Sequence, residues 1–176
     1  KDFLWVTQLK RTTIGAGYGG QAVAERMVRW EQSNQRVFLK LISYDIVADP
    51  ATPIAQAVAD ANQPAILRAF PVLVSSPAGD PVIDVTGLFM TEVTEFSPRQ
   101  NLGARGMDSS RSYLEKVVSF PENINVQVTQ TYTSGAAGDA AVGRGRAGMR
   151  GSTGTVVLFH SIVRLPERAM TPRLAD

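Results

Sequence analysis

A two-residue alternation of apolar and polar side chains recurs along this chain and limits it to a fold built mainly from strands. Ile124, Val126 and Val128 alternate with polar residues, and residues 155–163 form a second run rich in β-branched side chains. Successive side chains of a strand point to opposite faces of a sheet, so this pattern is typical of strands with one buried face. We therefore predict that these two segments are strands that pair with each other.

Other segments have the composition of strands and hairpins. Residues 3–9 are apolar and strand-forming. Residues 26–32 and 36–44 alternate on either side of a Ser-Asn turn, which favours a β-hairpin, although this region also fits a helical face. A second hairpin is predicted where residues 65–74 and 82–85 flank a loop rich in Ser, Pro, Gly and Asp.

Three segments have less regular patterns. Residues 87–96 fit a short helix or an irregular turn, and residues 113–120 fit a strand or a helix. Residues 97–111 mix Pro, Gly, Asn, Asp, Ser and Arg, and this composition predicts an ordered loop.

One short helix is predicted near residues 53–62. Thr52 has the residue type of a helix cap and Pro53 suits the first helical position, and apolar residues then recur as far as about Asn62. The predicted fold class is therefore α+β, with a mostly antiparallel sheet and this helix; an all-β fold is the nearest alternative.

Length and composition favour one domain over residues 1–176. With 44% hydrophobic residues, 176 residues suffice for one core, and dividing them would leave pieces too small to be stable. No run approaches the roughly 18 apolar residues that a membrane helix needs, so no membrane span is expected. The chain opens on a strand pattern and ends without a helix cap or charged tail, so we expect a fragment of a longer polypeptide.

The segment 134–154 is a low-complexity insert within that domain. It contains seven of the chain's 15 glycines together with Arg144, Arg146 and Arg150, and we expect a flexible hairpin loop. Arginine-glycine segments also bind RNA, but this one has no aromatic residue and the net charge of the chain is only +2. Nucleic acid is therefore a weak alternative partner.

Residues 15–20 match the G-x-G-x-x-G pattern of dinucleotide-binding loops. That pattern requires an apolar strand that runs directly into its first glycine, followed by a helix. Here Lys10, Arg11, Thr12 and Thr13 intervene, and the chain lacks the alternating helices of a doubly wound sheet. A plain glycine-rich loop is the favoured interpretation, and no cofactor is predicted.

No residue is assigned as catalytic, cofactor-binding or metal-ligating. The chain has no cysteine, which excludes disulfides, thiolate zinc sites and cysteine nucleophiles, and His160 is its only histidine. We expect His160 to be a structural strand residue, since no nucleophile accompanies it.

The aspartates near predicted turns and helix ends are expected to cap backbone groups rather than to ligate calcium, because their spacing matches no EF-hand loop. These aspartates are Asp45, Asp49, Asp60, Asp80 and Asp84.

Several ordered blocks of this sequence carry a family resemblance, among them Ser43-Tyr44-Asp45-Ile46-Val47-Ala48-Asp49 and Phe120-Pro121-Glu122-Asn123-Ile124. The other blocks are residues 3–8, 17–21, 28–31, 53–58, 82–86, 129–133, 165–167 and 170–173. Together they resemble the uncharacterised domain that precedes the catalytic domain in large bacterial zinc-dependent metalloproteases of metzincin type.

The resemblance implies a non-catalytic role for this chain. In that family the zinc-binding His-Glu-x-x-His helix lies further along the parent chain, and no position here matches it. It implies an accessory or structural domain that packs on the catalytic domain of the same chain, with peptide or protein as a possible substrate, in a periplasmic or extracellular protein. A propeptide-like inhibitor or folding chaperone is the alternative, and a module that binds a small ligand or nucleic acid is a third hypothesis from another class.

Overall fold

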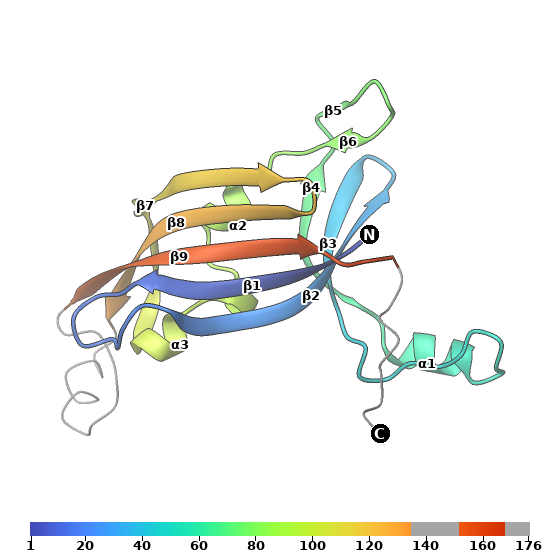
Figure 1. Cartoon of the computed structure of the whole chain (residues 1–176), viewed down its shortest axis with the longest axis horizontal. Coiled ribbons are helices and arrows are strands. Elements are labelled where there is room, and N and C mark those ends of the chain that lie inside the picture. The colour runs from blue at the N-terminus through green and yellow to red at the C-terminus, as the bar shows by residue number, and fades with distance from the viewer. Residues whose placement is uncertain (135–151, 168–176) are drawn as a thin grey trace, which may run out of the picture.

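The protein is built around one curled antiparallel sheet, seen in a computed structural model that describes residues 1–134 and 152–167. The sheet curves as a half-barrel, and its strand order is β4-β3-β2-β1-β9-β8-β7 (Figure 1). The bounds are β1 (Asp2–Arg11), β2 (Gln21–Ser33), β3 (Arg36–Ile42), β4 (Ala65–Pro71), β7 (Ala104–Phe120), β8 (Asn123–Ser134) and β9 (Thr153–Arg164). The predicted strand-dominated, mostly antiparallel fold is confirmed.

Smaller elements complete the described chain. β5 (Val74–Ser75) and β6 (Pro81–Val82) form a separate two-stranded sheet. The helices are α1 (Ala55–Ala61), α2 (Thr86–Met90) and α3 (Arg99–Leu102), and η1 (Thr94–Phe96) is a 3₁₀ helix. None of the helices in residues 1–134 and 152–167 is long and apolar enough to cross a bilayer.

The pairing predicted from alternation is confirmed. β8 and β9 run antiparallel, with Ile124 opposite Ile162 and Val128 opposite Leu158. Val126, Val128 and Leu158 are almost fully buried, because one face of each strand lies against the core.

The first predicted hairpin is also confirmed, with β2 beginning earlier than expected at Gln21. Asn34 adopts a φ of 53° in the turn between β2 and β3, a conformation that asparagine tolerates better than most residues. The second hairpin is smaller than predicted. Residues 65–71 pair with β3 instead, so only Val74 and Ser75 pair with β6.

The predicted start of the helix and the predicted loop at residues 97–111 were both wrong. The helix starts later, because Asp49 accepts hydrogen bonds from the Ala51 amide and the Thr52 hydroxyl and holds a turn there. Ile54, not Thr52, is the cap residue. Residues 97–111 are not a loop: α3 lies within them and β7 begins at Ala104. The ambiguous segment 113–120 belongs to β7, and residues 87–96 contain most of α2 and all of η1.

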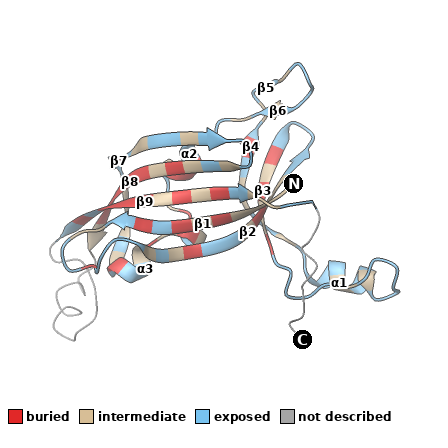
Figure 2. Ribbon diagram, in the orientation of Figure 1, coloured by how far each residue is buried: buried red, intermediate tan, exposed pale blue. Residues whose placement is uncertain are grey.

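The core lies between the sheet and a segment that we call the strap, residues 86–103, which contains α2, η1 and α3 and covers one face of the sheet (Figure 1). Trp5 is 1% exposed, stacks on Phe96 of the strap at a ring distance of 4.3 Å, and contacts Phe89 at 5.6 Å. Figure 2 shows the buried residues concentrated on β1, β8 and β9. The strap therefore supplies the second layer that the sheet needs.

The predicted insert 134–154 falls mainly outside the described residues. At its base, the Ser134 amide donates to the Ser152 carbonyl at 2.9 Å, so the ends of β8 and β9 lie side by side as a hairpin requires.

Candidate functional site

The connection between β3 and β4, residues 43–64, stands away from the sheet, and we call it the arm (Figure 1). β3 and β4 are antiparallel neighbours, which a turn of about two to five residues can join, so the sheet does not require the arm. The arm contains α1, and no residue of α1 is buried (Figure 2).

The arm exposes large apolar side chains. Tyr44, Ile46, Val47 and Ile54 are each exposed by half or more, up to 70% for Val47. A helix of seven residues is marginal by itself in water, because nucleation costs more than so few hydrogen bonds return. Several large exposed apolar residues on one short segment are typical of a surface that contacts another protein.

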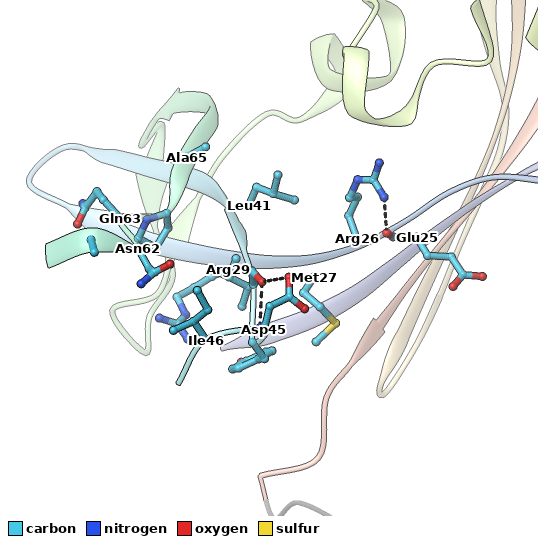
Figure 3. A pocket seen from close by; sticks show the side chains of 15 residues that line it. Glu25, Arg26, Met27, Arg29, Leu41, Asp45, Ile46, Asn62, Gln63 and Ala65 are labelled. Carbon is cyan, nitrogen blue, oxygen red and sulfur yellow. Dashed lines mark hydrogen bonds between the residues drawn. The ribbon is translucent and has the colours of Figure 1, made fainter. Parts of the chain in front are cut away.

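An open groove of about 840 Å³ separates the arm from the sheet (Figure 3). Arg26 donates from its guanidinium to the carbonyl of Glu25 at 2.8 Å, and Ser43 donates from its hydroxyl to Asp45 at 2.6 Å. The groove is lined by residues 25–27, Arg29, residues 41–46 and residues 61–65. Its walls therefore combine apolar side chains with charges of both signs.

A charged cluster fixes the root of the arm. Arg29 donates to both carboxylate oxygens of Asp2, at 2.6 and 2.8 Å, and the Tyr44 hydroxyl donates to the same carboxylate. The hydrogen bond from Arg29 is the main cause that lowers the pKa of Asp2 to about 2. The bond to Asp2 likewise raises the pKa of Tyr44. The arm is thereby tied to β1 and β2.

The end of β9 reaches the same root. A second cavity, of about 750 Å³, is lined by Lys1, Asp2, Met27, Arg29, Tyr44 and residues 164–167. Met27, Arg29 and Tyr44 line both cavities. Arg164 continues the charged surface through ion pairs with Glu122 and Glu167, both at 3.4 Å.

Substituting Asp2 by Asn tests this root. The change removes the charge that Arg29 binds, and we expect the free energy of unfolding to fall by about 1 kcal/mol, a small value because the cluster is partly exposed. The loss of stability should be largest above pH 4, where the Asp2 carboxylate is ionised in both the folded and the unfolded protein. It should vanish as the pH approaches 2, where the carboxylate becomes protonated. Urea titrations at several pH values measure it.

Glu31→Gln is the matched control, because Glu31 forms an exposed ion pair with Lys40 on the same sheet. It should leave the urea midpoint nearly unchanged. Equal midpoint shifts for the two variants would show that the Asp2 cluster stabilises the fold no more than an exposed ion pair does.

His160 lies far from the arm, inside the core. It is 4% exposed, its Nδ1 accepts from the Trp5 indole at 3.2 Å, and the Thr7 hydroxyl lies 2.9 Å from the same atom. Burial lowers the pKa of His160 to about 3. Among residues 1–134 and 152–167, no three His, Cys, Asp or Glu side chains gather in a way that could hold a metal ion.

The predicted role of capping backbone groups holds for two of the aspartates. Asp49 accepts from the Ala51 amide at 2.9 Å, and Asp84 accepts from the Thr86 amide at 2.8 Å. Asp45 accepts from the Ser43 hydroxyl, a side chain rather than a backbone group, beside the groove. Asp60 instead accepts from the Gln56 side chain within α1, and Asp80 contributes its backbone to the turn between β5 and β6.

The glycine-rich segment 15–20 is a loop that runs straight into β2, so no helix follows it as a dinucleotide site would need. A Cβ at Gly19 would lie 2.4 Å from the Lys10 carbonyl oxygen, and the Gly20 amide donates to Leu9 at 2.5 Å. Gly19 is therefore required for close packing of the backbone. Arg144, Arg146 and Arg150, the residues of the nucleic-acid alternative, lie outside the described residues.

A family model described as a domain of unknown function, DUF5117, matches residues 20–176, which is most of the chain. The chain belongs to the DUF5117 family. No curated protein and no solved structure matches it. In this DUF5117 domain the match covers the arm, the strap and all strands except β1.

Sequence reasoning predicted the helix of the arm but missed that the arm stands away from the sheet, and it missed the root. The apolar residues Ile46, Val47 and Ile54 between β3 and α1 resemble ordinary core residues until their exposure is known. The Asp2–Arg29–Tyr44 cluster has no sequence signal, because its members come from three separate segments.

Proposed function

We propose that this DUF5117 domain is a non-catalytic accessory domain of a secreted zinc-dependent metalloprotease, and that it packs against the catalytic domain of the same chain through the arm. The proposal joins the sequence resemblance to one observation, the exposed arm. The resemblance also implies a periplasmic or extracellular location.

The arm supports an interaction role because a much shorter connection would join β3 to β4. Its apolar residues Ile46, Val47 and Ile54 are 60, 70 and 61% exposed, and burying such a side chain in an interface contributes about 1.5–3 kcal/mol. Apolar anchors beside a polar, partly charged groove are the usual composition of a protein interface.

The placement of His160 supports a non-catalytic role. Its Nδ1 is occupied by Trp5 and Thr7, and the ring is enclosed by the strap, so a metal or substrate would reach it only if the core opened. We propose that zinc chemistry and the cleft for peptide belong to the catalytic domain of the proposed parent.

Hydrogen exchange tests the docking of the arm. We expect amides of residues 43–64 to exchange at least about tenfold more slowly in the full-length gene product than in the isolated domain, because a docked segment must open before it exchanges. The double substitution Val47→Asp and Ile54→Asp should remove that protection by placing two carboxylates in the interface.

The matched control is Leu73→Asp with Val74→Asp, a pair that is 59 and 61% exposed near β5, outside the arm. It should leave the exchange of the arm unchanged. Equal exchange of residues 43–64 in the isolated and full-length proteins would contradict docking. Chelator-sensitive peptide hydrolysis by the isolated domain would contradict the non-catalytic role.

A further inference from the structure

His160 carries its proton on Nε2. The indole nitrogen of Trp5 is a donor only, and it lies 3.2 Å from Nδ1, so Nδ1 must accept and be unprotonated. The lowered pKa of the buried ring is consistent with the neutral form. A neutral imidazole without a proton on Nδ1 has its N–H at Nε2.

That Nε2–H is a buried donor for which residues 1–134 and 152–167 supply no acceptor. Nε2 has no solvent exposure and no hydrogen-bond partner in the part of the chain that the structure describes. Leaving such a donor unsatisfied costs about 1–3 kcal/mol, and buried polar groups in native proteins are nearly always paired.

His160 also lines a small cavity in the core. It measures about 10 Å³ and lies between β1, β8 and β9 on one side and the strap on the other. A cavity of about 10–15 Å³ is large enough to hold one water molecule. Besides His160, its lining includes Trp5, Phe89, Gln130 and Tyr132.

Two oxygens in the lining have acceptor capacity to spare. The Tyr132 hydroxyl donates to Gln130 Oε1 at 2.8 Å, and Gln130 Nε2 donates to the Phe89 carbonyl at 3.1 Å. A phenolic oxygen that donates its own proton can still accept, and an amide oxygen accepts two hydrogen bonds. Both residues are almost fully buried, so bulk water does not supply their partners.

We infer that this cavity is a binding site for a single structural water molecule, which accepts from His160 Nε2–H and donates to an oxygen of Gln130 or Tyr132. The water completes a chain of hydrogen bonds from Thr7 and Trp5 on β1, through His160 on β9 and Gln130 on β8, to Phe89 of the strap. A cavity of this size does not admit a larger ligand. The bound water joins the sheet to the strap through hydrogen bonds within an apolar core.

Two measurements on the unaltered protein test this site. Nitrogen-15 NMR of labelled histidine should show a neutral ring with the proton on Nε2 and a slowly exchanging Nε2–H. Oxygen-17 relaxation dispersion should reveal a long-lived internal water, and the Nε2 proton should show a nuclear Overhauser contact to it. A proton on Nδ1, or an Nε2 proton without a water contact, would overturn the inference.

A variant adds a second readout. His160→Phe removes the donor and fills part of the cavity, so the relaxation dispersion should lose the contribution of one long-lived water relative to the unaltered protein. An undiminished dispersion amplitude in a folded His160→Phe protein would place the internal water elsewhere and overturn the assignment. If the variant does not fold, the NMR measurements on the unaltered protein decide the matter.

Discussion

Trp5→Ala is expected to lower the free energy of unfolding by about 4 kcal/mol. The Trp5 side chain is 1% exposed, stacks on Phe96, contacts Phe89, and donates to His160. The substitution leaves a cavity between sheet and strap and also removes the donor to a buried imidazole. Since single domains are stable by only about 5–15 kcal/mol, urea unfolding should show a large fall in the midpoint.

Phe120→Ala provides the matched comparison, because Phe120 is an aromatic residue of the same sheet that is 52% exposed. It should cost less than about 1 kcal/mol, because little apolar surface returns to water and no cavity forms. A Trp5→Ala protein as stable as Phe120→Ala would mean that the strap is not packed on the sheet through Trp5.

The pH dependence of stability should depend strongly on His160. The pKa of this residue is about 3 in the folded protein and 6.5 in a model peptide, so between these values the unfolded chain binds a proton that the folded protein excludes. The contribution of neutral His160 is fully present above pH 6.5 and is lost as the pH falls toward 3. The slope is at most about 1.4 kcal/mol per pH unit.

His160→Gln should remove that slope while retaining an acceptor for the Trp5 indole. Urea midpoints between pH 4.5 and pH 7.5 measure the difference between the two proteins, and this window avoids the titration of Asp2 near 2. The variant is expected to be less stable than the unaltered protein at pH 7.5 and to approach it as the pH falls. Parallel stability curves would contradict the buried, neutral state of His160.

The strand pairing could be predicted because alternation has physical consequences that are local. A slip of one residue between β8 and β9 would turn Val126, Val128 and Leu158 to the opposite face, so the pattern fixes both the pairing and the buried side. The hairpin of β2 and β3 could be predicted for the same reason, and Asn34 marked its turn.

The start of β7 could not be predicted, because its alternation is interrupted. Its pairing with β8 shifts register three times, between Ala104 and Gly106, between Asp108 and Tyr113, and between Leu114 and Lys116. Each bulge adds residues without partners and moves the period-two pattern out of phase. β7 is also an edge strand, so many of its side chains are exposed and the apolar signal is weak.

Local sequence patterns are enough to specify that this protein is strand-dominated, which strands have one face toward a core, and that residues 15–20 are a loop. These properties depend on neighbours along the chain. Three-dimensional packing places Asp2 opposite Arg29 and Thr7 opposite His160, and it leaves Val47 and Ile54 of the arm exposed. Such facts depend on which strands become neighbours and on which apolar residues the core leaves uncovered, and no local pattern encodes either.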